Sequence, residues 1–211
     1  MNFIQQPMAI EKRSMEIIAP YVEKYAKNEA ESKVYSRIIH AAGDVEYAPI
    51  IHIHPEAVAA AQRALLAGCD VYTDVEMVRT GINKNKLASF GGSVHCLIRD
   101  EAVARMAKAE GITRSMAAMR TFGSALEGAV VAIGNAPTAL YEVLRLSMEE
   151  HIYPAVIIGI PVGFVGAADA KAKLAVNTFV PYITVAGTKG GSPIAAAAVN
   201  AILYLLDDQR Y

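Results

Sequence analysis

The sequence predicts an α/β protein with three layers (α/β/α), in which helices cover both faces of a mainly parallel central sheet. From residue 69 onward, short runs of Val, Ile and Ala alternate with longer helical segments. Such runs are typical of strands buried on both faces, and their alternation with helices favours a parallel sheet. We see no internal repeat, linker or low-complexity tract. We therefore expect a single domain over residues 1–211, with helices preceding the sheet.

The N-terminal part is predicted to be helical. Residues 8–27 place apolar side chains on one helical stripe, with Pro20 as a kink or break. A second helix is expected over residues 31–42. A third begins at Pro55 and stops at Gly68, the favoured placement of Pro and Gly at helix ends.

Strands and helices alternate through the rest of the chain. Expected strands cover residues 69–73, 93–98, 129–133, 155–160 and 182–186. Expected helices cover residues 100–110, 113–127, 137–148, 167–176 and 192–206. Asp74 is expected to cap the turn or helix that follows the strand 69–73.

Composition excludes several classes of protein. A net charge of −1 argues against a general nucleic-acid surface, although it allows a local basic pocket. Cys69 and Cys96 are too few for a disulfide framework or a zinc cluster. The N-terminus lacks the features of a signal peptide, and the apolar runs are too broken to form a membrane span. We expect a cytoplasmic protein that interacts with neither nucleic acid nor membrane.

Three glycine-containing junctions between strands and helices are candidates for anion binding. They lie at residues 130–137, 157–166 and 184–193, and Lys189 would add positive charge to the last. Backbone N–H groups at such turns bind phosphate or carboxylate. Any one loop is equally well explained as a tight turn without a ligand. Their spacing matches neither a Walker A loop nor a dinucleotide-binding fingerprint.

The segment 36–54 holds three of the five histidines. His40 ends a helical run one turn after Arg37, which suits proton transfer beside an anionic substrate. A lone histidine near an apolar helix is nevertheless more often a buried structural residue. His52 and His54 share one face of an extended segment, but no third ligand has a clear spacing, so we expect no metal. His95 is expected to be structural.

Other polar groups fit a ligand-lining role. The run 73–82, which contains Thr80, is dense in polar residues within an apolar frame. Arg114 stands at a helix start, where it would grip an anion or form a surface salt bridge.

Several uncommon strings occur in the order typical of one family. They are residues 36–44 (SRIIHAAGD), 73–82 (TDVEMVRTGI), 113–115 (TRS), 134–140 (GNAPTAL), 160–165 (IPVGFV) and 187–192 (GTKGGS). On these motifs, the chain resembles the precorrin-8X methylmutases, also known as cobalt-precorrin-8 methylmutases, over essentially its whole length.

The resemblance implies an isomerase of cobalamin biosynthesis. Family members move a methyl group from C-11 to C-12 of a corrin-type macrocycle bearing several carboxylates. The resemblance implies an acid–base role for His40 and substrate contacts for Ser14 and Arg37. Arg114, Thr80 and Lys189 are taken as further substrate contacts. No cofactor is implied. The resemblance also implies a homodimer, and either the N-terminal helix or the segment 45–54 could form the contact between the subunits.

Two alternatives remain open on the residues themselves. A non-catalytic carrier of an acidic tetrapyrrole would use the same arginines and glycine loops. An α/β enzyme acting on a nucleotide or sugar phosphate is the other, although the chain lacks both phosphate-binding fingerprints. Whether the natural substrate carries cobalt is also open.

Overall fold

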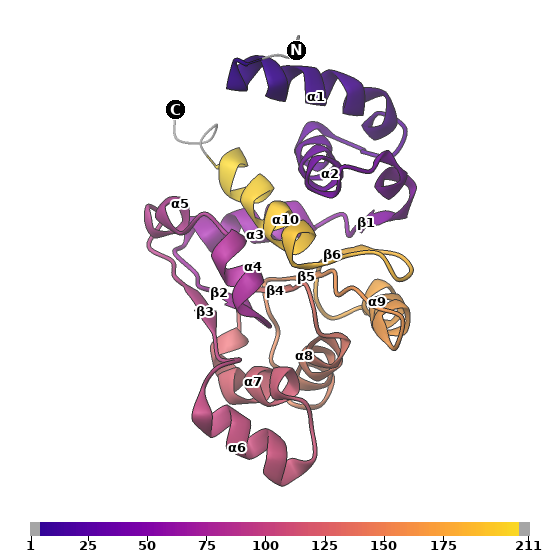
Figure 1. Cartoon of the computed structure of the whole chain (residues 1–211). Helices are drawn as coiled ribbons and strands as arrows, with labels where there is room; N and C mark the ends of the chain where they lie inside the picture. The colour runs from indigo at the N-terminus through magenta and orange to yellow at the C-terminus, as the bar shows by residue number, and fades with distance from the viewer. Residues whose placement is uncertain (1–4, 207–211) are drawn as a thin grey trace.

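The computed structural model describes residues 5–206, which form a six-stranded sheet with helices on both faces (Figure 1). The strand order is β1-β6-β5-β4-β2-β3. β1 runs antiparallel to β6, and all other neighbouring pairs are parallel. The predicted fold class is therefore confirmed. The strands are β1 (Ile51–Ile53), β2 (Val71–Thr73), β3 (Val94–Cys96), β4 (Val130–Ile133), β5 (Val156–Gly159) and β6 (Tyr182–Val185).

The helices divide between the two faces of the sheet (Figure 1). The first face carries α2 (Glu29–Ala42), α3 (Ala57–Leu66), α4 (Glu76–Gly81), α5 (Lys84–Ala88) and α10 (Ser192–Leu205), with α1 (Pro7–Val22) outside α2. The second face carries α7 (Arg114–Phe122), α8 (Pro137–Glu149) and α9 (Ala167–Ala175), with α6 (Glu101–Glu110) outside α7. Two 3₁₀ turns, η1 (Val45–Ile50) and η2 (Gly123–Leu126), complete the elements.

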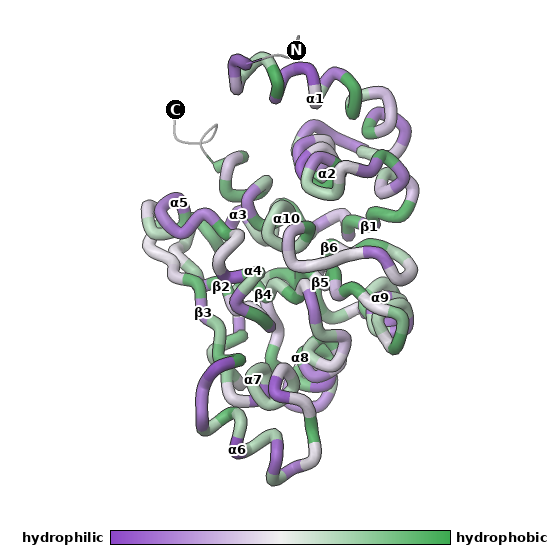
Figure 2. Tube along the Cα trace, in the orientation of Figure 1, coloured by the Kyte–Doolittle hydropathy of each residue, from purple (hydrophilic) through white to green (hydrophobic). Residues whose placement is uncertain are grey.

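The sheet is buried on both sides because alternate strand residues enter different cores. Val130 and Ala132 of β4 belong to the first core, whereas Val131 and Ile133 belong to the second. This is the period of two expected for a strand. Figure 2 shows apolar colour along the strands and α10, whereas α6 alternates between polar and apolar residues.

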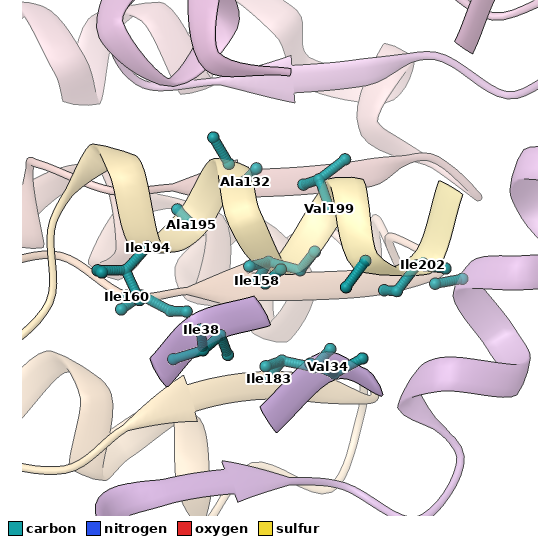
Figure 3. Close-up of a cluster of buried hydrophobic side chains, with 14 of the residues drawn as sticks. Val34, Ile38, Ala132, Ile158, Ile160, Ile183, Ile194, Ala195, Val199 and Ile202 are labelled. Carbon is teal, nitrogen blue, oxygen red and sulfur yellow. The ribbon is translucent and has the colours of Figure 1, made fainter. Parts of the chain in front are cut away.

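Helices α2 and α10 pack against each other over the first face of the sheet. Figure 3 shows Ile38 of α2 close to Ile160 and Ile194, within the same buried cluster. Asn28 caps the start of α2 by accepting a hydrogen bond from the Glu31 N–H. At the other end Gly43 adopts φ 62°, a left-handed conformation that ends the helix. This packing fixes where the C-terminal turn of α2 lies.

Two local predictions were wrong. The first helix passes through Pro20 and ends at Val22, so it is shorter than the expected 8–27. Pro20 lies in the last turn, where the missing N–H costs one helical hydrogen bond. Asp74 does not cap α4: the residue before that helix is Val75, which makes no side-chain cap. The Asp74 carboxylate instead accepts backbone N–H groups from a different loop.

Within residues 5–206, no helix is both long and apolar enough to cross a bilayer.

Candidate active site

The candidate site lies at the carboxyl edge of the sheet. Because β2, β3, β4, β5 and β6 are parallel, the loops that follow them emerge at the same edge. The three glycine-containing junctions predicted from the sequence therefore lie at one edge of the sheet. Ligands bind at such edges in open α/β sheets.

The C-terminal end of α2 joins this edge through the loop between β6 and α10. Lys189 Nζ lies 2.6 Å from Asp44 Oδ2 and 3.2 Å from Glu46 Oε2. The Tyr47 hydroxyl donates to the Gly190 carbonyl at 3.5 Å. These contacts connect the segment just after His40 to the 187–191 loop.

His40 lies in the last turn of α2 and is exposed. Its ring makes no hydrogen bond or ion pair within the part of the chain that the structure describes. The C-terminal end of a helix favours a positive charge through the helix dipole. An exposed imidazole at that position can exchange protons with a bound ligand. The sequence alone favoured a buried histidine, and the structure does not bury it.

Arg37 lies one turn before His40, and its guanidinium is turned toward α1 and α10. It lies 2.9 Å from the Glu11 carboxylate and stacks over the Tyr204 ring at 5.4 Å. A cavity of about 540 Å³ opens between α1, α2 and α10, and its lining includes Glu11, Met15, Arg37 and Tyr204. Arg37 is therefore paired with a carboxylate of the protein itself.

Ser14 lies on α1, and its hydroxyl donates to the Ile10 carbonyl at 2.9 Å. Its helix neighbours Glu11 and Met15, rather than Ser14 itself, line the cavity beside Arg37. Ser14 is half-buried. The structure places Ser14 near this cavity but does not bring its hydroxyl into contact with Arg37 or His40.

Thr80 and Arg114 are exposed on helices that begin at the carboxyl edge. Thr80 is the fifth residue of α4. Arg114 is the first residue of α7, whose N-cap Thr113 makes a 2.8 Å hydroxyl–hydroxyl hydrogen bond to Thr138 of α8. Arg114 therefore lies beside the loop that follows β4.

Comparisons with known proteins identify the family of the chain. A sequence model of precorrin-8X methylmutase matches residues 9–205. The chain belongs to the precorrin-8X methylmutase family. It is similar to the cobalt-precorrin-8 methylmutase of Priestia megaterium, at 40% identity over 96% of this chain and 89% of the relative. It is similar to the precorrin-8X methylmutase of Sinorhizobium sp, at 40% identity over 95% and 96%. A solved structure of precorrin-8x methyl mutase from Thermus thermophilus superposes with a TM-score of 0.85 at 33% identity, covering 96% and 100%.

Membership in the methylmutase family makes the chain an isomerase of cobalamin biosynthesis.

Among the described residues, no group of three or more His, Cys, Asp or Glu side chains could hold a metal ion. His52 is exposed on β1, whereas His54 packs against Tyr182 with ring centroids 5.7 Å apart. His95 pairs with Asp70 at 2.8 Å and stacks on Tyr72.

One predicted anion-binding loop is occupied by the protein itself. Asp74 is fully buried, and its carboxylate accepts the N–H groups of Gly134, Asn135 and Ala136 at 3.1, 2.8 and 2.7 Å. Burial raises the pKa of the Asp74 carboxyl, and the three N–H donors oppose that shift. The loop after β4 therefore does not offer these groups to a substrate carboxylate. The sequence placed Asp74 after a strand but gave no sign of its distant partners.

A second feature missed by the sequence analysis is an apolar tip in the loop between β5 and α9. Phe164 and Val165 are 95% and 90% exposed. They lie between Gly163 and Gly166, which have φ values of 151° and 76°. The tip projects at the same edge as Lys189, since the Gly163 N–H donates to the Thr188 carbonyl at 3.1 Å. Phe164 and Val165 therefore form an exposed apolar tip beside the 187–191 loop.

Proposed function

We propose that this chain catalyses the methyl shift from C-11 to C-12 of precorrin-8X or cobalt-precorrin-8, giving hydrogenobyrinic acid or cobyrinic acid. Substrate and product are isomers. The carbon–carbon bond at C-11 breaks and a new one forms at C-12, so no atom or electron enters or leaves. The observation that carries the proposal is the exposed imidazole of His40 at the carboxyl edge, in a chain of this family.

His40 acts as the acid–base group. A proton given to the macrocycle helps the conjugated system to redistribute charge while the methyl group moves, and the same proton is returned afterwards. A positioned imidazole contributes roughly 10²- to 10⁴-fold in such a role. Further rate enhancement comes from holding the ring in a reactive geometry.

The macrocycle's carboxylates are bound by Arg37, Arg114 and Lys189, with hydrogen bonds from the hydroxyls of Ser14 and Thr80. Arg37 and Lys189 are already paired with carboxylates of the protein. A substrate carboxylate therefore replaces an internal one rather than meeting a free cation. The apolar face of the ring is expected to contact Phe164 and Val165, which are otherwise exposed to water.

The decisive experiment replaces His40 with Asn and with Ala and follows the absorption change of the macrocycle. We expect turnover to fall by roughly 10²- to 10⁴-fold while product affinity is retained. His52→Asn is the matched control, because His52 is also exposed but lies on β1. Turnover of the His40 variants near the wild-type rate would refute the proton-transfer role.

A second experiment tests the charge contact. Arg37→Ala should weaken product binding, and the loss should be larger at low salt, where charge attraction is least screened. Arg105→Ala is the control, because Arg105 is an exposed residue of α6 that pairs only loosely with Glu101, at 3.7 Å. An unchanged product affinity in Arg37→Ala would remove Arg37 from the site.

We also propose that the chain forms a homodimer through α1. Ile10, Ile17 and Tyr21 are 46%, 53% and 41% exposed, and their spacing places them on one helical face. Sedimentation of Ile17→Lys beside the wild type tests this: we expect a monomer. A variant that still sediments as the wild type does would move the interface elsewhere, with the segment 45–54 as the other candidate.

Whether the natural substrate carries cobalt is not decided by similarity, because relatives of both names are 40% identical to this chain. Side-by-side turnover of metal-free and cobalt-loaded substrate would decide it. We propose the cytoplasm as the place where this enzyme acts.

A further inference from the structure

Lys171 of α9 is a buried cation that the proposed chemistry does not use. Its side chain is among the largest that are fully buried, with 1% of the residue exposed. Burying an ammonium group is costly unless it is paired. Within residues 5–206 no carboxylate forms an ion pair with it. Its Nζ donates to the backbone carbonyl of Lys189 at 2.5 Å.

The hydrogen bond from Lys171 reaches a loop that is already joined to its neighbour. The Gly163 N–H donates to the Thr188 carbonyl at 3.1 Å, and the Gly191 N–H donates to the Ile160 carbonyl at 2.9 Å. The loops 160–166 and 187–191 therefore form one unit at the carboxyl edge. The hydrogen bond from Lys171 to the Lys189 carbonyl connects the centre of that unit to α9.

The same unit contacts the segment that follows His40. The Lys189 side chain pairs with Asp44 and Glu46, while its backbone carbonyl is held by Lys171. Phe164 projects from the other loop of the unit. A shift of the Lys189 backbone would therefore move a charge contact and an apolar contact together.

We infer that Lys171 is a positioning residue, whose buried ammonium fixes the Lys189 backbone and with it the substrate-contacting loops beside His40. This inference rests on the proposed function. An apolar residue of similar size would avoid the cost of burying a charge, yet it could not donate to the Lys189 carbonyl. A charged donor makes a stronger hydrogen bond than a neutral one.

The positioning role of Lys171 can be tested by changing its protonation state with pH. Burial lowers the pKa of the Lys171 ammonium from 10.5 to about 8. Titratable groups lie on each element around Lys171. They are Tyr141, Glu142, Arg145 and Glu149 of α8, Tyr182 of β6, Lys189 with Asp44, Glu46 and Tyr47 at the loop, and Asp169 and Lys173 on α9 itself. Burial raises the pKa of Tyr47 and of Tyr141, while the ion pair raises that of Lys189 and lowers that of Asp44. The shifts of these four groups carry their pKa values away from 8.

The test compares wild type with Lys171→Met, and uses Lys173→Met as the matched control on the exposed side of α9. Binding of hydrogenobyrinic acid and turnover are measured one pH unit below and above about 8. Below that pH, Lys171→Met should bind product about tenfold more weakly and show a raised KM with little change in kcat. Wild-type affinity should fall as the pH rises through about 8, whereas the affinity of Lys171→Met should stay level.

A measurement without substrate separates this inference from the proposed function. Hydrogen exchange of the 187–191 amides should be faster in Lys171→Met than in wild type at the lower pH, and the difference should shrink at the higher pH. Absence of turnover in wild type with this exchange pattern intact would reject the proposed function alone. Lys171→Met with wild-type product affinity, wild-type pH response and wild-type loop exchange would overturn the role of Lys171.

Discussion

Replacing Asp74 with asparagine is expected to destabilise the protein and displace the loop between β4 and α8. The Asp74 carboxylate accepts three backbone N–H groups, and the hydrogen bonds from Gly134 and Ala136 are buried. An asparagine side chain has one acceptor oxygen, and its NH₂ group would face a backbone donor instead of accepting from it. The substitution therefore leaves at least one buried N–H group without a partner.

The expected cost follows from the number of donors affected. A buried donor without a partner costs about 1–3 kcal/mol, and bonds to charged groups lie at the upper end of the usual range. We expect a loss of about 2–4 kcal/mol for Asp74→Asn, and of about 3–6 kcal/mol for Asp74→Ala, which removes every acceptor. Since domains are stable by about 5–15 kcal/mol, the Ala variant would be close to unfolding.

Urea denaturation followed by far-ultraviolet circular dichroism measures these losses, with Tyr emission as a second probe because the chain has ten Tyr and no Trp. The matched control is Asp100→Asn. Asp100 also accepts two backbone N–H groups, at 2.8 and 3.1 Å, but at the exposed start of α6. Asn caps helices as well as Asp does, so the control should lose less than about 0.5 kcal/mol. If Asp74→Asn unfolds at the same urea concentration as the control, the buried-acceptor argument is refuted.

Three further predictions concern the loops and charges of the site. Burial lowers the pKa of Lys171 to about 8, so between pH of about 8 and 10.5 the unfolded chain holds a proton on Lys171 that the folded chain lacks. The free energy of unfolding of the wild type should therefore rise with pH over this range, by up to about 3 kcal/mol relative to Lys171→Met. Urea denaturation at several pH values measures this rise, and a difference between the two proteins that does not change with pH would contradict the lowered pKa. Gly190→Ala should destabilise the protein by about 2 kcal/mol or more and weaken product binding, because Gly190 has φ +150° and a Cβ there would lie 2.6 Å from the Ile160 carbonyl oxygen. An unchanged melting temperature in calorimetry would show that the two loops adjust to the added methyl group. Glu11→Gln should strengthen product binding in a titration, because it frees the Arg37 guanidinium, and unchanged binding would argue that Arg37 does not meet the substrate.

The order of elements was largely predictable from the sequence. Buried strands such as β4 and β5 appear as short apolar runs, and Asn28 and Gly43 frame α2 with local signals. Parallel pairing then follows from the alternation of strands and helices, and it brings the glycine-containing loops to one edge. The position of His40 at the end of α2 was equally local information. These features depend on neighbours within a few residues along the chain.

The electrostatic state of the site was not predictable, because it depends on partners far apart in sequence. Asp74 binds N–H groups that lie 60 to 62 residues further along. Lys189 pairs with Asp44 across 145 residues. The burial of Lys171 depends on how α9 packs against the loop after β6. A lysine in a helical pattern normally indicates solvent, so no sequence signal distinguished Lys171 from Lys173.

These pairings change how a polycarboxylate substrate would be recognised. A cation that is paired with a protein carboxylate gains less from a substrate carboxylate than a free cation would, because one charge contact replaces another. Affinity therefore depends on several such exchanges occurring together. On the proposed function, a rigid macrocycle presents many carboxylates at once and a small diacid only two, so the exchange of Glu11 at Arg37 and of Asp44 at Lys189 favours the macrocycle.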